Sequence, residues 1–204
     1  MNTIYRGIGI GNNSVQAEAF RISPRKTLPE LSKTFPNVEH EMVRYQDALA
    51  AFVRQLDAKS AQANENSVKE ILYAQSVMAQ DPELADSVLQ NIKEGWSAES
   101  AVQLGMQKFT QELLGASDEF GERIADLKEI EYRIIQWLLH DVEEDKLPTS
   151  GEIIVVAEDL SPLETAAFTD VVKGVVTEKG GPTSHTADRK STRLNSSHIP
   201  LSRM

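Results

Sequence analysis

Residues 153–178 read IIVVAEDLSPLETAAFTDVVKGVVTE, and this stretch decides the fold class. It opens with an apolar run typical of a buried strand, which ends in acidic residues. Ser161 then fits a helix N-cap, with Pro162 at the first helical position and Glu164 three residues after the cap, the pattern of a capping box. A second apolar run, VKGVVTEK, predicts another strand. Strand, short helix and strand in this order indicate an α/β domain.

The N-terminal residues 3–22, TIYRGIGIGNNSVQAEAFRI, predict two short strands with a turn near Gly11. We expect the first strands and the later ones to share one sheet. The alternating glycines resemble a dinucleotide-binding loop, but G-x-G-x-x-G would need glycine at position 12, where Asn12 stands. No long helix follows either, so the pattern disfavours nucleotide binding.

Between residues 36 and 143 the hydrophobic period becomes helical. Further helices are predicted over 67–80, after the Asp81-Pro82 pair, after a Ser97 N-cap, and from Ser117 onward. We predict a bundle of four or five helices inserted into the α/β domain, with the apolar stripes forming its core. The first stripe consists of Val38, Met42, Tyr45, Leu49, Phe52 and Leu56.

Four segments follow from this pattern. Residues 1–30 form the first part of the α/β domain, 31–145 the helical bundle, and 146–187 the second part of the α/β domain. Residues 188–204 differ in composition, because they carry a net charge of +3 in a chain whose formal net charge is -10.

The composition narrows the class of protein. The 204 residues include no cysteine, which excludes disulfides and thiolate metal sites. No apolar run has the length of a membrane helix, and the N-terminus lacks a signal-peptide pattern, so the expected location is the cytoplasm. The acidic balance disfavours nucleic acid and anionic membranes as partners and favours a basic protein.

The loop GGPTSHTA at 180–187 has the composition of a chemical site. Its glycines allow close approach of the backbone to a ligand, and its hydroxyl groups suit an anion. His185 is a good nucleophile near neutral pH, and these surroundings suit a phosphoryl group carried on a ring nitrogen. The alternative is a loop histidine without a role. A serine hydrolase is disfavoured because G-x-S-x-G is absent, and a metal site because the other histidines, His40, His140 and His198, show no ligand spacing with His185.

The same loop resembles the phosphohistidine loop of the phosphoenolpyruvate-utilising enzymes. The preceding VVAEDLSPLETAAF is similar to the strand and helix before that loop in Enzyme I of the bacterial phosphoenolpyruvate:sugar phosphotransferase system. KEILYAQSVMAQDPEL, at 69–84, resembles the helix pair of that family that contacts the phosphocarrier HPr, and ERIADLKEIEYRI its later long helix. The resemblance covers residues 4–187. The loop alone also fits pyruvate phosphate dikinase or phosphoenolpyruvate synthase, which place an ATP-binding domain before it.

The resemblance implies roles for individual residues. His185 would receive a phosphoryl group from phosphoenolpyruvate and pass it to a histidine of HPr, within a loop that includes Gly180, Gly181, Thr183 and Ser184. Thr165 matches the family threonine that hydrogen-bonds the active imidazole. HPr would contact Leu72, Gln75, Met78 and Leu84, for which bundle core is the alternative role. Many relatives have histidine at the position of Gln75 and glutamate at that of Tyr73.

The family continues with a barrel domain that binds phosphoenolpyruvate and Mg²⁺ and supplies a homodimer interface. This sequence has no such segment, so we expect no metal site within it. Residues 188–204, DRKSTRLNSSHIPLSRM, match nothing in the family and are interpreted as translated adapter or vector sequence, or as a frameshifted end. The alternative is a natural basic tail. We therefore expect a chain that exchanges phosphate with HPr but does not accept it directly from phosphoenolpyruvate. The alternative is a helical docking module alone.

Overall fold

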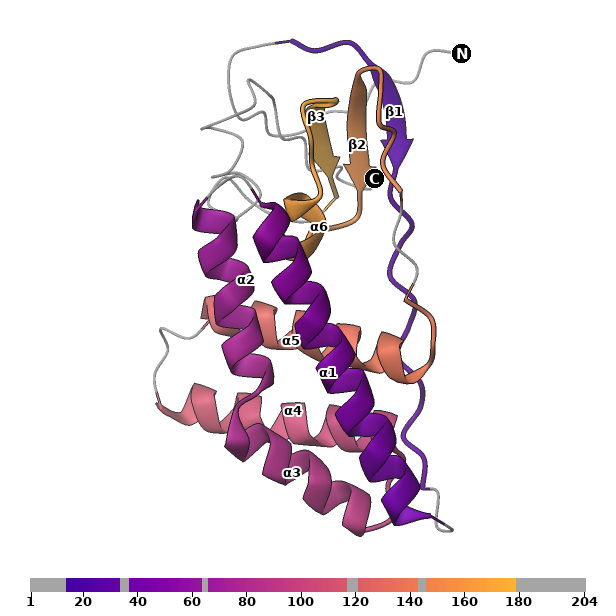
Figure 1. Cartoon of the computed structure of the whole chain (residues 1–204), viewed down its shortest axis with the longest axis vertical. Helices are drawn as coiled ribbons and strands as arrows, with labels where there is room; N and C mark the ends of the chain where they lie inside the picture. Colours follow the sequence, from indigo (N-terminus) through magenta and orange to yellow (C-terminus); the bar gives the residue numbers. More distant parts are fainter. Residues whose placement is uncertain (1–13, 34–36, 64–65, 117–120, 143–145, 179–204) are drawn as a thin grey trace. The chain divides into compact units, whose positions relative to one another are not determined.

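The structure is a computed structural model that describes residues 14–33, 37–63, 66–116, 121–142 and 146–178 (Figure 1). The chain divides into two compact units. One is formed by Met1–Lys26 together with Glu144–Met204, and the other by Thr27–Glu143. The sheet belongs to the first unit and the long helices belong to the second.

The first unit contains a parallel sheet of three strands in the order β1-β2-β3. These are β1 (Glu18–Arg21), β2 (Ile153–Ala157) and β3 (Val172–Thr177). The N-terminal strand pairs directly with β2, Phe20 standing opposite Val155, so the prediction that early and late strands share one sheet is confirmed. The predicted turn near Gly11 lies outside the described residues.

A short helix, α6 (Pro162–Ala166), follows β2 and has the predicted capping box. The backbone N–H of Glu164 donates to Ser161 Oγ at 3.2 Å, and the N–H of Ser161 donates to Glu164 Oε2 at 2.8 Å. These reciprocal bonds satisfy donors that the start of the helix would otherwise leave open. The core beside this helix is made of aliphatic side chains from the two longer strands and Leu160, namely Ile153, Val155, Ala157, Leu160, Val172 and Val175.

The second unit consists of five helices in its described part, which confirms the predicted bundle. They are α1 (Val38–Gln62), α2 (Asn66–Ala79), α3 (Pro82–Lys93), α4 (Ala98–Ala116) and α5 (Gly121–Leu138). Helix α1 packs against α2 and α5, and α4 packs against α3 and α5. Two predicted N-caps are present: Asp81 accepts from Glu83 N–H at 2.8 Å, and Ser97 Oγ accepts from Ser100 N–H at 3.2 Å. In the described part of the chain, no helix is long and apolar enough to cross a membrane.

An extended segment, residues 29–33, enters the helical unit along the start of α4. The N–H of Ser97 donates to the carbonyl of Ser32 at 3.1 Å, and the N–H of Ser32 donates to Ser100 Oγ at 2.9 Å. Farther along α4, Gln103 Nε2 donates to the carbonyl of Pro29 at 3.1 Å. We call residues 29–33 the strap, because these bonds hold it on α4.

A cluster of charges also meets at the start of α4. Arg44 on α1 donates to Glu41 Oε2 at 2.8 Å, to Glu99, and to the carbonyl of Leu138 at 3.1 Å. Glu41 Oε2 in turn accepts from the N–H of Ala98 at 2.7 Å. Burial alone would raise the pKa of Glu41, but the bond from Ala98 and the guanidinium of Arg44 outweigh it and hold that pKa below its ordinary value. The cluster therefore joins α1, α4 and the end of α5.

Close packing of α3 on α4 requires glycine at position 105. A Cβ at Gly105 would lie 2.8 Å from Val88 Cγ2 and 3.4 Å from the Val88 backbone nitrogen. We expect Gly105→Ala to destabilise the helical unit by about 1–2 kcal/mol, although alanine is the better helix former by about 1 kcal/mol. Urea denaturation measures the change. Gln107→Ala, exposed on the same helix, should stay within about 0.5 kcal/mol of the parent, and a stabilised G105A variant would contradict the packing argument.

Glu131 on α5 gives the helical unit a pH dependence near neutrality. Burial raises the pKa of Glu131 to about 7, against an opposing effect of Lys128. The pKa of Glu131 is higher in the folded than in the unfolded chain. The native state therefore loses stability as the pH rises from the ordinary carboxyl value of 4.5 to about 7. We therefore compare the free energy of unfolding of Glu131→Gln with that of the parent. With allowance for partial solvent screening, we expect the difference to favour the variant by about 1–2 kcal/mol more at pH 8 than at pH 5. Urea denaturation at pH 5 and at pH 8 tests this, with the exposed Glu70→Gln as control. The expectation would be contradicted if the stability of Glu131→Gln relative to the parent were the same at both pH values.

Candidate functional site

The carboxyl ends of the three parallel strands lie at one edge of the sheet. Ligands of parallel α/β sheets bind preferentially at this edge. Beyond it, β2 leads into α6, and β3 leads through Glu178 toward the GGPTSHTA loop. That loop, with Gly180, Gly181, Thr183, Ser184 and His185, lies outside the described residues, so its role as the chemical site stays a prediction.

Two buried hydroxyl groups belong to the elements around this edge. Thr165 on α6 is 4% exposed, and Thr177, the last residue of β3, is 2% exposed. The backbone of Thr165 is held by a bond from its N–H to the carbonyl of Ser161 at 3.0 Å. The sequence singled out Thr165 through the family resemblance alone. The sequence analysis did not single out Thr177. The signal that could have identified it is a hydroxyl residue at the end of an otherwise apolar strand.

The same edge carries an ion pair between the N-terminal segment and α6. Arg25 Nη2 lies 3.8 Å from Glu164 Oε2, the carboxylate that also closes the capping box. Arg25 follows β1 by four residues, and an arginine is well suited to contact a phosphoryl group. The pair thus places a cation on the side of α6 near the carboxyl ends of the strands.

Three of the four predicted docking residues are interior. Leu72 and Gln75 are 0% exposed and Leu84 is 1% exposed, while Met78 is half-buried. Gln75 Nε2 donates to Asp126 Oδ1 at 3.0 Å and so ties α2 to α5. These positions therefore fit bundle core, the alternative role that the sequence had left open for them. A direct docking role for them stays a prediction.

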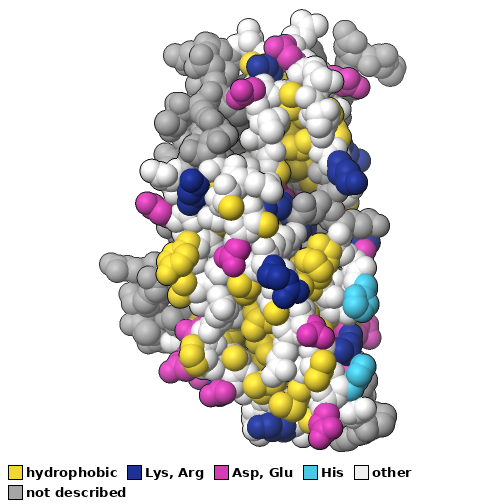
Figure 2. Space-filling view, viewed as in Figure 1, with side chains coloured by type: hydrophobic (Ala, Val, Ile, Leu, Met, Phe, Trp, Pro, Cys, Tyr) yellow, Lys and Arg dark blue, Asp and Glu magenta, His cyan; other side chains and the backbone are white. Residues whose placement is uncertain are grey.

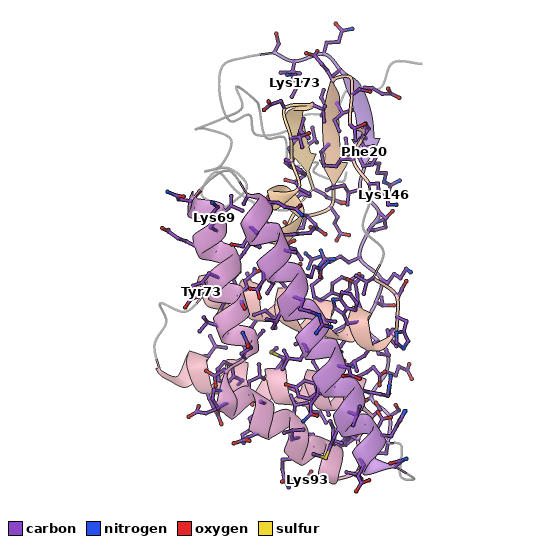
Figure 3. The ribbon with its side chains drawn as sticks, in the orientation of Figure 1. Phe20, Lys69, Tyr73, Lys93, Lys146 and Lys173 are labelled. Atoms are coloured by element: carbon purple, nitrogen blue, oxygen red, sulfur yellow. The ribbon has the colours of Figure 1, made fainter. Side chains whose placement is uncertain are left out.

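Helix α2 exposes a different pair of apolar side chains. Tyr73 is 70% exposed and Val77 is 52% exposed. They are one helical turn apart, and Figure 3 shows Tyr73 projecting outward from α2. The sequence analysis did not assign them to docking. The usable signal was that both fall outside the stripe that contains Val68, Leu72 and Ala79.

An acidic groove runs between α3 and α4. It has a volume of about 540 Å³, and the side chains that line it include Glu83 and Asp86 from α3 with Lys108, Phe109 and Glu112 from α4. The four charged groups sum to -2. This groove is shallow and polar, unlike a pocket for an apolar small molecule.

Two family profiles match the chain. The family described as PEP-utilising enzyme, N-terminal matches residues 3–123, and the one described as PEP-utilising enzyme, mobile domain matches residues 149–187. Together they match parts of both compact units, and the second match ends at residue 187, the last residue of GGPTSHTA.

Curated relatives carry the name phosphoenolpyruvate-protein phosphotransferase. The Streptomyces coelicolor protein is 35% identical over 191 residues, covering 92% of this chain and 34% of that protein. The Bacillus subtilis protein is 30% identical over 192 residues, covering 89% of this chain and 33% of that protein. The chain thus spans about a third of the length of these relatives.

Solved structures agree in fold. An NMR solution structure of Enzyme I (nEIt) superposes with a TM-score of 0.78 at 27% identity, covering 97% of this chain and 83% of that chain. The N-terminal domain of Enzyme 1 - Nitrogen superposes with a TM-score of 0.62 at 22% identity, covering 96% and 83%, and supports the fold alone. These neighbours confirm the predicted α/β part with an inserted helical bundle. The chain therefore belongs to the family of phosphoenolpyruvate-utilising enzymes and carries the N-terminal and mobile-domain segments of that family.

Proposed function

We propose that this chain carries the phosphohistidine step of a phosphoenolpyruvate-protein phosphotransferase, with His185 as the phosphoryl carrier. The observation that carries the proposal is the GGPTSHTA loop, which follows the last strand of a parallel sheet in a chain whose relatives bear that name. The name itself describes transfer of a phosphoryl group from phosphoenolpyruvate to a protein.

In the whole protein, a ring nitrogen of His185 would attack the phosphorus of phosphoenolpyruvate. The bond between phosphorus and the enol oxygen breaks, and the enolate that leaves takes up a proton to give pyruvate. A histidine nitrogen of the acceptor protein then attacks the same phosphorus, and the bond to His185 breaks. Such transfers depend on in-line placement and charge stabilisation more than on further covalent steps.

The surrounding residues have separate roles in this proposal. The hydroxyl of Thr165 would orient the imidazole, since a fixed ring presents one nitrogen to the phosphorus. The backbone at Gly180 and Gly181 and the hydroxyls of Thr183 and Ser184 would donate to the phosphoryl oxygens. Thr165 is buried on a capped helix, which limits its rotamers and favours this orienting role.

Phosphoenolpyruvate and Mg²⁺ are proposed to bind to other parts of the whole protein, which would form a homodimer. Within the residues that the structure describes, no three histidine or acidic side chains gather as a metal site requires.

The acceptor is proposed to be the cytoplasmic phosphocarrier HPr, bound by the helical unit. The formal net charge of -10 and the acidic groove between α3 and α4 favour a basic partner. The names of the relatives require a protein acceptor, which agrees with a docking role for this unit.

The test is transfer of phosphate from phosphorylated HPr to this chain, which does not require a site for phosphoenolpyruvate. We expect acid-labile phosphate that maps to the peptide containing His185. Circular dichroism should confirm that the chain is helical. Absence of phosphate on a folded chain that binds HPr would contradict the carrier role and leave a docking module.

A further inference from the structure

The loop that contains His185 has no cation of its own. Residues 180–187 supply amides, hydroxyls and an imidazole, but neither lysine nor arginine. Carboxylates follow β2 and β3 toward the edge where this loop begins, at Glu158, Asp159 and Glu178. Figure 2 shows acidic and basic side chains interspersed over the unit that holds the sheet, not a broad basic surface on this face. The charge of a phosphoryl group would therefore have to be balanced by an individual cation from another segment.

The segment that follows β1 brings an arginine to this edge. Ile22 continues the pairing of β1, since its N–H donates to the carbonyl of Val156 at 2.9 Å. Three residues later, Arg25 Nη2 lies 3.8 Å from Glu164 Oε2 on α6. Figure 1 shows α6 beyond the arrowheads of β2 and β3. The guanidinium of Arg25 thus lies on the helix at the carboxyl ends of the strands.

The start of the loop reaches the same edge from β3. The strand order β1-β2-β3 places β2 in the middle, and Thr177 of β3 pairs with Ala157, the last residue of β2. The N–H of Glu178 donates to the carbonyl of Ala157 at 3.1 Å, so the chain is still beside the end of β2 two residues before Gly180. Because the strands are parallel, the segment with Arg25, helix α6 and the loop follow three neighbouring strands at one edge.

The contact between Arg25 and Glu164 contributes little to folding. Its length of 3.8 Å exceeds that of an N–H···O hydrogen bond, and the two side chains are 37% and 22% exposed. The capping box is complete without the arginine, since Glu164 Oε2 accepts from the N–H of Ser161 at 2.8 Å. Arg25 can therefore leave Glu164 without unfolding α6.

We propose that Arg25 is a further catalytic residue, whose guanidinium passes from Glu164 to the phosphoryl group carried on His185. The inference rests on the function proposed above. A guanidinium can bind two phosphoryl oxygens at once, and the larger charge of a phosphoryl group attracts it more strongly than one carboxylate does. As the bond from phosphorus to the donor nitrogen breaks and the bond to His185 forms, Arg25 keeps its proton and balances the charge on the oxygens. Glu164 holds the guanidinium at the edge before the phosphoryl group arrives.

The experiment measures the rate of phosphate transfer to this chain over a range of concentrations of phosphorylated HPr. We expect Arg25→Gln to lower kcat about 10- to 100-fold and to leave KM within about threefold, because a charge-assisted bond to the transferring group is lost. Arg25→Lys keeps the charge without the planar fork, so its kcat should lie between those of Arg25→Gln and the parent.

A matched control comes from an ion pair at the opposite edge of the same sheet. Lys173 Nζ lies 3.8 Å from Glu152 Oε1, and its side chain is 37% exposed, as is that of Arg25. Figure 3 shows Lys173 at the end of β3 away from α6. Lys173→Gln removes a cation of similar exposure from the same unit and should transfer phosphate at the rate of the parent.

Guanidinium ion in solution separates a charge role of Arg25 from a structural one. We expect millimolar guanidinium chloride to raise kcat of Arg25→Ala at least about fivefold, because the free ion can occupy the place of the missing side chain. Sodium chloride at the same ionic strength should not do so. Circular dichroism verifies that each variant is folded.

Three results would overturn the inference. They are a kcat of Arg25→Gln equal to that of Lys173→Gln, an Arg25→Ala variant that guanidinium does not restore, and a loss confined to Lys179→Gln, which removes the cation that precedes the loop. In each case the parent still carries phosphate on His185, and the proposed function stands. If the folded parent accepts no phosphate from HPr, the proposed function fails and this inference fails with it.

Discussion

Replacing His185 with alanine is expected to abolish acceptance of phosphate from phosphorylated HPr. The imidazole forms the bond to phosphorus, so no other group can substitute for it in the proposed step. We expect incorporation of acid-labile phosphate to fall by at least about 10³-fold, to background. The measurement is radiolabelled phosphate retained at alkaline pH and released in acid.

Matched controls come from the other histidines. His40→Ala, on the exposed surface of α1, and His198→Ala, in the same C-terminal stretch as the loop, should both accept phosphate at the rate of the parent. Acid-labile phosphate that survives in the H185A variant would show that another residue is the carrier, and the proposed function would then be wrong.

The largest effect on stability is expected at the buried ion pair of α5. Arg133 Nε donates to Glu129 Oε1 at 2.8 Å, and their side chains are 5% and 3% exposed. Arg133→Met would leave the carboxylate of Glu129 in the interior without its cation. We expect a loss of about 3–5 kcal/mol in the free energy of unfolding, because burying an uncompensated charge is costly.

The double variant Glu129→Leu, Arg133→Met separates loss of the charge partner from loss of packing. It should recover most of the stability that the single variant loses, ending within about 1–2 kcal/mol of the parent. Urea denaturation followed by tryptophan fluorescence reports on the helical unit, since Trp96 and Trp137 both lie in it. A double variant less stable than the single one would mean that the pair contributes through its fit rather than through charge compensation.

What the sequence predicted correctly was mostly local. Three helix starts were predicted from residues within three positions of one another, so their spacing can be recognised in the sequence. They are the capping box at Ser161, the Asp81 cap and the Ser97 cap. The shared sheet was also predictable, because strand-like patterns stand at both ends of the chain with the helical pattern between them.

What the sequence did not predict depends on distant partners. The start of α4 is also held by Glu41, a residue of α1 that the helical period does not mark as interior. The docking role that the resemblance gives to Leu72, Gln75 and Leu84 stays a prediction, and a helical period could not show that these three side chains are buried in the bundle. The exposure of Tyr73 and Val77 became visible only when the structure showed which face of α2 the other helices leave uncovered.

The meeting of strap, charge cluster and α5 at the start of α4 bears on the order of folding. Glu18 must pair with Ile153, and the whole helical unit lies between them in the chain. Closing a parallel pair across a disordered segment of that length is slow and entropically costly. Ser97 and Ser100 hold the incoming strap, and Glu99 holds Arg44, which binds the carbonyl of Leu138 at the outgoing end. The folded bundle thus brings the point where the chain enters it and the point where the chain leaves it to the start of α4. This shortens the effective loop between β1 and β2, so we expect the sheet to form after the bundle.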